Sequence, residues 1–233
     1  RARWARARAG GADIAALGFT PSRIYERERE HEIDGKTFER TEYSVKVGAR
    51  EFKRLLVELG VPTGRTVESG FTTPDCLDRL TDWQRGLYLS AYFGAELSAP
   101  AAQHGKNFQC PTFSQTRAGA CADAGEQFVR EVADYLGRVG VETSGIERFD
   151  ADSGVDRERL RLGLENDSQN LVRFFERVGY RYNESKQREA VSALQYLKTK
   201  ERTVEDRVEI AAEVAHLADG GTPVADWYEV NDR

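Results

Sequence analysis

A single acid at the end of an unusually apolar stretch is the residue of this sequence best placed for chemistry. Residues 82–97 read Asp-Trp-Gln-Arg-Gly-Leu-Tyr-Leu-Ser-Ala-Tyr-Phe-Gly-Ala-Glu-Leu, and they predict a helix with apolar or small residues on more than one side. Such a helix is normally buried on two faces. Pro100 limits its length, so it can pack against a partner helix and project Glu96 into a shared site. A core helix with an incidental Glu at its end is the alternative.

The composition excludes several classes of protein. The chain has 233 residues, with 34 Lys and Arg residues against 39 Asp and Glu residues and a formal net charge of −5. It has no apolar run of about 18 residues that would predict a membrane span, and its Arg-rich start lacks the apolar segment of a secretory signal. Three cysteines without a CxxC pair and three scattered histidines support neither a zinc site nor a disulfide framework. We therefore expect no membrane partner and a cytoplasmic location.

The basic residues are mostly arginines, although the net charge is acidic. The chain contains 27 Arg and 7 Lys residues. An acidic net charge argues against a nucleic-acid partner. An acidic, Lys-poor chain is also compatible with a salt-loving source, in which bulk charge is a poor guide to binding. Local clusters of basic residues must then decide.

Hydrophobic periodicity and turn residues predict alternating helices and hairpins. Helices are expected at 1–17, 49–59, 82–97, 126–139, 169–178 and 184–218, and hairpins around Asp34-Gly35, over 104–116 and over 145–165. Pro111 favours an edge or a bulge within the second hairpin. Residues 61–81 are rich in Pro, Gly and Thr and predict a linker on the surface.

Four of the expected helices end in the same way, with a glycine after an apolar residue. Gly18 and Gly60 are 42 residues apart, Gly140 and Gly179 are 39 apart, and each interval holds one hairpin and one helix. This repeat predicts two halves of one architecture. Glu96 precedes Gly140 by 44 residues, and the same offset from Gly18 falls before residue 1. With no methionine in the chain, we expect a fragment whose first half is incomplete.

Residues 89–97, Leu-Ser-Ala-Tyr-Phe-Gly-Ala-Glu-Leu, resemble the nine-residue motif of the LAGLIDADG homing endonucleases, including those within inteins. Glu96 falls on the metal-binding acid, where Asp is commoner, and Leu97 replaces the usual glycine. The stretch 59–65 resembles the family's inter-repeat junction, and 181–218 resembles a helical extension of some archaeal intein endonucleases.

The resemblance implies a fold and a domain organisation. The expected fold is α+β, with tandem pseudo-symmetric LAGLIDADG repeats (α-ββ-α-ββ-α), the first one incomplete, and a C-terminal helical extension. The expected boundaries are 1–66 for the partial first repeat, 67–81 for the linker, 82–180 for the second repeat and 181–233 for the extension.

The resemblance also implies an activity, site-specific hydrolysis of double-stranded DNA with Mg²⁺ as cofactor. Glu96 would be the catalytic acid and metal ligand, with a partner acid upstream. Gln115 near the scissile phosphate and Lys46 as a peripheral basic residue are further catalytic candidates; ordinary exposed strand residues are the alternative for both. A homodimer through the helix 84–97 would restore two acids, and the helix-interface residues are Leu89, Ala91, Tyr92, Gly94 and Ala95.

In that family the hairpins read DNA, because a twisted sheet in the major groove places alternate side chains on base edges. The expected DNA-binding residues are polar or basic side chains of the hairpins: Lys106, Asn107, Gln109, Ser114, Gln115, Arg117, Arg148, Arg157, Arg159, Arg161, Arg23, Arg27, Arg29 and Arg40. A salt-bridged exposed face of alternating Arg and Glu is the other interpretation.

Two other functions stay open at this point. A non-catalytic DNA-binding regulator or an RNA-splicing maturase could use the same scaffold, and the departures from the motif favour that interpretation. An α+β protein without any role at DNA is favoured by the sequence pI of about 5.5.

Overall fold

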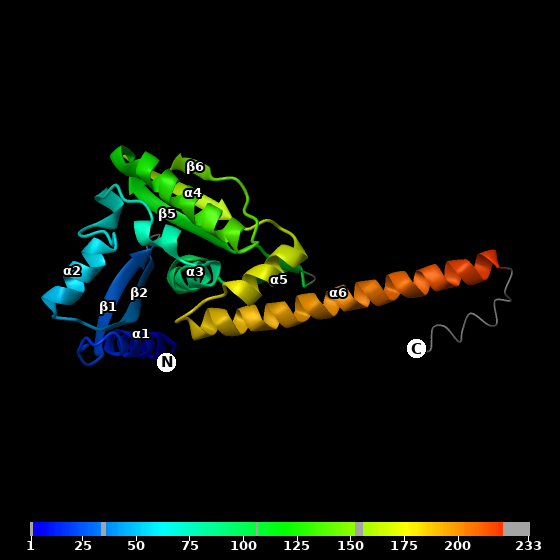
Figure 1. Cartoon of the computed structure of the whole chain (residues 1–233), viewed down its shortest axis with the longest axis horizontal. Helices are drawn as coiled ribbons and strands as arrows, with labels where there is room; N and C mark the ends of the chain where they lie inside the picture. Colours follow the sequence, from blue (N-terminus) through cyan, green and yellow to red (C-terminus); the bar gives the residue numbers. More distant parts are fainter. Residues whose placement is uncertain (1, 34–35, 106, 152–155, 221–233) are drawn as a thin grey trace. The chain divides into compact units, whose positions relative to one another are not determined.

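The computed structural model describes residues 2–33, 36–105, 107–151 and 156–220. It mixes helices and strands (Figure 1), and its internal contacts divide the chain into two units after Val191. The elements in chain order are α1 (Ala2–Ala16), β1 (Tyr25–Ile33), β2 (Lys36–Ser44), α2 (Arg50–Glu58), α3 (Asp82–Glu96), β3 (Ala101–Gln103), β4 (Asn107–Gln109), β5 (Thr112–Ala118), α4 (Ala122–Arg138), β6 (Glu147–Asp150), β7 (Arg157–Gly163), α5 (Ser168–Arg177) and α6 (Glu184–Asp219).

The first unit begins with a helix, an antiparallel hairpin and a second helix. Strand β1 pairs with β2, and α1 packs against β2. Because side chains alternate along a strand, Arg27 and Arg29 share one face of the hairpin, while Glu26 and Glu28 share the other. The turn expected at Asp34-Gly35 lies outside the described residues.

The glycines expected to end the helices have the backbone conformation that this role requires. The φ angles of Gly18, Gly60, Gly140 and Gly179 are +86°, +83°, +80° and +64°. A residue without Cβ adopts this left-handed conformation at little cost, and it commonly follows the last turn of a helix. The expected tandem arrangement of the two halves stays a prediction.

Helix α3 begins at a capping box and lies in the core of the first unit. Thr81 accepts a hydrogen bond from the backbone N–H of Gln84, whose side chain accepts one from the Thr81 backbone, so two free N–H groups are satisfied. Leu89 and Phe93 are fully buried. Burial on several sides agrees with the apolar and small residues of this stretch.

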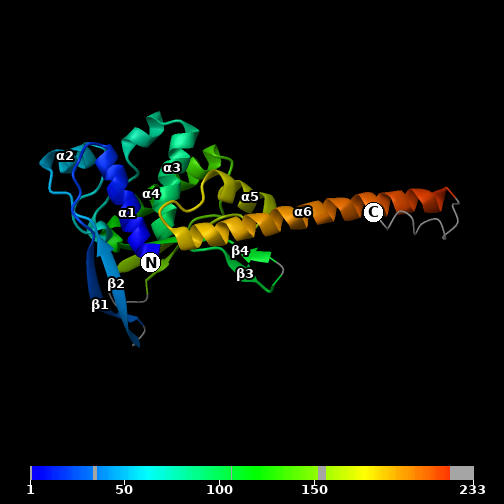
Figure 2. The same ribbon diagram turned by 90° about the horizontal axis from the view of Figure 1, so that it is seen from below.

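A three-stranded antiparallel sheet, in the order β5-β7-β6, follows α3 in the chain. Helix α4 packs on one face of it (Figure 1). Phe113, Leu160 and Leu162 point to that face and are buried. The hairpin expected over 104–116 is interrupted: β3 and β4 form a separate small hairpin (Figure 2), and β5 begins only after Pro111, which has no N–H to donate to a ladder.

Helix α6 begins in the first unit and continues into the second. Every residue from Arg202 to Glu209 is exposed. The described part of the chain contains no helix that combines the length and the apolar composition of a membrane span.

Candidate nucleic-acid interface

The carboxyl end of α3 brings two of the predicted catalytic residues to one cavity. Glu96 is exposed, and it lines a cavity of about 430 Å³ together with Gln115 of β5. The side-chain amide of Gln115 donates to the Tyr92 hydroxyl and accepts from Arg117 Nη2 at 2.7 Å. Burial, and next the negative charge of Glu96, raise the pKa of Tyr92, so this phenol stays neutral.

The third predicted catalytic residue lies in the N-terminal half. Lys46 is exposed, and its Nζ lies 4.9 Å from the ring centroid of Tyr25. Arg23 lies over the same ring at 5.3 Å. Lys46 does not line the cavity that contains Glu96. Its geometry is that of a cation stacked on an exposed aromatic ring.

The donor set around Glu96 does not fit a resident Mg²⁺. Glu96 is the one carboxylate that lines its cavity, and the described part of the chain holds no group of three His, Cys, Asp or Glu residues that could bind a metal. Magnesium needs several oxygen ligands in near-octahedral geometry. The expected Mg²⁺ therefore stays a prediction that requires ligands beyond these residues.

The small residues of α3 are packed against another part of the same chain. A Cβ on Gly94 would overlap the carbonyl oxygen of Arg181. The backbone N–H of Arg181 donates to the Ser90 carbonyl at 3.0 Å, and Asn183 Nδ2 donates to the Gly94 carbonyl at 2.7 Å. The turn between α5 and α6 thus occupies the face on which Gly94 lies.

The other predicted helix-interface residues differ in exposure. Leu89 is fully buried, Ala91 and Tyr92 are half-buried, and Ala95 is exposed. Leu89 is therefore buried without a second copy of α3.

The face of the sheet that points away from α4 carries a row of arginines, which we call the arginine face. It is formed by Ser114 and Thr116 of β5, Arg157, Arg159 and Arg161 of β7, and Glu147 and Phe149 of β6. The three arginines are exposed, and Phe149, opposite Arg159, is 39% exposed. Arg161 lies 3.6 Å from Glu147. Arg157 and Arg159 form no ion pair with the described residues.

The alternation of side chains places other predicted DNA-binding residues on the opposite side. Gln115 and Arg117 pair with Leu160 and Glu158, so they point towards α4. Arg117 is only 2% exposed. The residues expected from the sequence on β5 therefore combined its two faces, which the alternation of side chains separates. Only the structure shows which of these faces meets α4.

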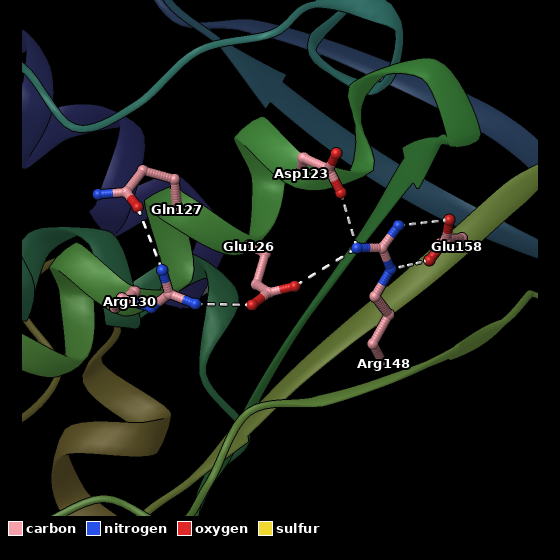
Figure 3. A network of polar contacts seen from close by, with 6 residues as sticks. All are labelled: Asp123, Glu126, Gln127, Arg130, Arg148 and Glu158. Atoms are coloured by element: carbon pink, nitrogen blue, oxygen red, sulfur yellow. Dashed lines mark hydrogen bonds and ion pairs between the residues drawn. The ribbon is translucent and has the colours of Figure 1, made fainter.

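Arg148 also lies on the α4 side, within a network of acids (Figure 3). Its Nη2 donates to Glu158 at 2.8 Å and its Nη1 to Asp123 at 2.8 Å, and Glu126 lies 3.4 Å away. The hydrogen bonds to Glu158 and Asp123 raise the pKa of Arg148, and the same contact lowers the pKa of Glu158. The charge of Arg148 is thus neutralised within the chain.

The remaining predicted contacts are dispersed. Arg23, Arg27 and Arg29 are exposed on or beside β1, and Arg29 pairs with Glu42 at 3.0 Å. Arg40 lies in β2, opposite Arg29. Asn107 and Gln109 lie in β4, and Lys106 lies outside the described residues. Phe149 was missed, although the alternation in Glu-Arg-Phe-Asp places it on the face opposite Arg148.

Comparison with known proteins finds relatives that carry three different protein names. The chain is 29% identical over 209 residues to the tRNA-splicing ligase RtcB of Methanopyrus kandleri, 27% identical over 201 residues to the DNA-directed RNA polymerase subunit Rpo1N of Methanocaldococcus jannaschii, and 24% identical over 211 residues to the replication factor C small subunit of the same organism. These matches cover 88%, 84% and 89% of this chain, but 20%, 15% and 11% of the relatives. No family model and no solved structure matches.

These names correct the identification made from the 89–97 motif. The RtcB relatives, at 24–29% identity, are named for tRNA splicing and ligation, and no matching relative or family model names a homing endonuclease or an intein. The LAGLIDADG identification and the prediction of a DNA endonuclease are therefore withdrawn, and the comparisons support neither a regulatory role nor a role as a maturase. What the comparisons establish is a segment of about 200 residues that recurs within longer proteins.

Proposed function

We propose that this chain is a nucleic-acid-binding module of longer proteins, and that it binds the phosphate backbone of a duplex through the arginine face. The observation that carries the proposal is the row of Arg157, Arg159 and Arg161, which are exposed on one side of β7. The proposal concerns binding and assigns neither cleavage nor ligation to the chain.

The chemistry of the arginine face suits phosphate groups. Arg157 and Arg159 have their guanidinium groups available, because neither forms an ion pair with a described residue. The hydroxyl groups of Ser114 and Thr116 lie opposite Arg161 and Arg159, and such side chains commonly contact phosphate oxygens. Phe149 adds an exposed ring that could stack on a sugar or base.

The names of the relatives support the same class of partner. A tRNA-splicing ligase, a DNA-directed RNA polymerase subunit and a replication factor subunit are all named for work on nucleic acids. A segment shared by such different proteins has a role that is not special to one of their reactions. Double-stranded DNA, the partner expected from the sequence, is the form of nucleic acid that we propose.

Two further expectations from the sequence concern the location of the chain and its assembly into a homodimer. The cytoplasmic location stays in the proposal, because Cys76, Cys110 and Cys121 are free thiols and a reducing compartment preserves them. We do not propose a homodimer through residues 84–97, because the turn between α5 and α6 packs on part of that helix.

The proposal is tested by fluorescence anisotropy with a labelled DNA duplex and the double substitution Arg157→Gln/Arg159→Gln. Because each arginine pairs with phosphate and releases counterions, we expect the affinity at low salt to fall about tenfold or more. The control is Arg54→Gln, an exposed arginine that lies on α2 and not on the arginine face, which should leave the affinity unchanged.

Two outcomes would contradict the proposal. Equal weakening by Arg54→Gln would indicate attraction by overall charge alone, and no binding by the unaltered chain would remove the function. Repeating the titration with an RNA duplex of the same sequence distinguishes the two nucleic acids, because the shapes of their grooves differ. Tighter binding to RNA would contradict the choice of DNA.

A further inference from the structure

The cavity beside α3 has walls of unlike chemistry. Its volume is about 430 Å³, within the range of small-molecule sites. Aromatic rings supply much of the lining, from Phe71 in the linker, Tyr88 and Tyr92 in α3 and Phe128 in α4. Gln115 and Arg117 of β5 supply polar groups to the same cavity. A ligand with a planar apolar body would contact these rings, and its polar end would find hydrogen-bonding partners in Gln115 and Arg117.

Arg117 is a buried cation that lines this cavity. It is 2% exposed, its Nη1 donates to the Thr66 carbonyl, and its Nη2 donates to Gln115. Its guanidinium lies 4.0 Å from the ring centroid of Phe71, and Nε has no hydrogen-bond partner. No carboxylate of the described chain forms an ion pair with it. Burying an unpaired charge is costly, and burial lowers the pKa of Arg117.

We propose that this cavity binds a small organic anion with a planar apolar body and one negatively charged group, which pairs with Arg117. The anion supplies a counter-charge that none of the described residues provides, and the rings of Phe71, Tyr88, Tyr92 and Phe128 cover its apolar body. Ser114 and Thr116 of the arginine face also line this cavity, but the ligand pairs with Arg117 on the α4 side of β5 and does not depend on nucleic-acid binding.

Two features of the lining select the charge of the ligand. Glu96 is exposed where it lines the cavity, so its carboxylate disfavours a second negative charge on the ligand. Burial raises the pKa of Tyr88 to about 12, so this phenol is neutral at ordinary pH and does not repel an anion. The site therefore favours a single negative charge next to Arg117.

The test compares two fluorescent probes on the full chain. The dye 8-anilinonaphthalene-1-sulfonate is an aromatic anion with a planar naphthalene ring, and N-phenyl-1-naphthylamine is the same ring system without the sulfonate. We expect the anionic dye to saturate one site and to bind at least tenfold more tightly than the neutral dye. Arg117→Gln should weaken the anionic dye at least tenfold and leave the neutral dye unchanged.

Arg117→Gln also removes the hydrogen bond to the Thr66 carbonyl, which holds the linker. A second variant therefore tests the cavity without changing Arg117. Val67 lines the cavity from a short turn of the linker and is half-buried, so Val67→Trp fills the cavity and leaves Arg117 in place. We expect this variant to lose dye binding while its circular dichroism and unfolding temperature stay the same. Binding that survives Val67→Trp, or equal affinity of the unaltered chain for the two dyes, would overturn the proposal.

Discussion

Single residues show how the chain distributes its charges. Arg148 of β6 and Arg159 of β7 lie on neighbouring strands. Arg148 donates to Glu158 and Asp123, whereas Arg159 forms no ion pair with a described residue. Alternation along the strands sends one to the α4 side and the other to the arginine face. The side of the sheet on which an arginine lies thus decides whether it is available to a phosphate.

The contact of Arg148 with Glu158 predicts a pH-dependent effect on stability. Arg148 lowers the pKa of Glu158 below its ordinary value of 4.5. A carboxylate with a lowered pKa in the folded state stabilises the fold above pH 4.5 and loses this contribution as the pH falls through its folded pKa. We expect Arg148→Gln to lower the unfolding temperature at pH 7, and the difference from the unaltered chain to shrink below pH 4.5.

Thermal unfolding followed by circular dichroism from pH 7 to pH 3 measures this difference. Arg54→Gln is the control, since Arg54 is exposed on α2 and should give no pH-dependent difference. A difference for Arg148→Gln that stays constant over the whole range would show that its contact with Glu158 is not the cause.

A buried asparagine predicts a larger and pH-independent effect. Asn170 is fully buried; its side chain accepts from the Glu142 N–H at 2.8 Å and donates to the carbonyls of Glu142 and Glu165. Asn170→Ala removes the side-chain partner of the Glu142 N–H and of the Glu165 carbonyl, while the Glu142 carbonyl keeps the Glu165 N–H. We expect a loss of about 2–4 kcal/mol of unfolding free energy. Urea denaturation measures it, with Gln169→Ala, exposed in the same helix, as a control that should stay within about 0.5 kcal/mol.

At the scale of elements, close approach of backbones fixes the packing of α3. A Cβ on Gly94 would meet the Arg181 carbonyl group, and neither backbone can move without breaking the Ser90 and Asn183 hydrogen bonds. We expect Gly94→Ala to destabilise the fold by about 3 kcal/mol. Equilibrium unfolding in urea measures the change.

Gly137 in α4 offers the matched substitution. A Cβ at this helical position meets nothing within 4 Å, so Gly137→Ala should stabilise the chain by up to about 1 kcal/mol, because alanine is the better helix former. If the two substitutions had the same effect, the close contact at Gly94 could not be what sets the packing of α3.

At the scale of the whole molecule, the two units differ in how much of their helical surface is buried. Arg202 to Glu209 of α6 are all exposed, and a helical segment without tertiary contacts is marginal in water. We expect amide hydrogen exchange, measured by mass spectrometry, to be much faster in residues 200–220 than in α4. Slow exchange there would contradict this expectation and indicate that a partner covers the helix.

The net charge of the whole chain bears on how nucleic-acid binding depends on salt. The net charge is −5, so attraction to a duplex must come from the local arginine face rather than from the chain as a whole. We expect the affinity to fall steeply with KCl, and the Arg157→Gln/Arg159→Gln substitution to reduce the slope of log K against log salt by about 2. A slope that is the same in both proteins would place the phosphate contacts elsewhere.

Local signals in the sequence were enough for most element boundaries. The helix expected over 82–97 is α3 at Asp82–Glu96, and the helix expected over 169–178 is α5 at Ser168–Arg177. Caps, terminal glycines and hydrophobic periodicity act within one or two turns, so they can be read from neighbouring residues. The start of α4 was placed four residues late, because the turn before it, Gly119–Cys121, has no strong capping residue.

The sequence by itself determined the mixture of helices and strands, the lengths of the main helices and the presence of an acid at the end of α3. Only the tertiary structure decided which side chains meet. Gln115 reaches Tyr92, and Arg181 reaches Ser90 across 91 residues, and neither contact has a local signal. Strand register, which depends on partners far along the chain, is what separated the exposed Arg159 from the buried Arg117 and gave each its environment.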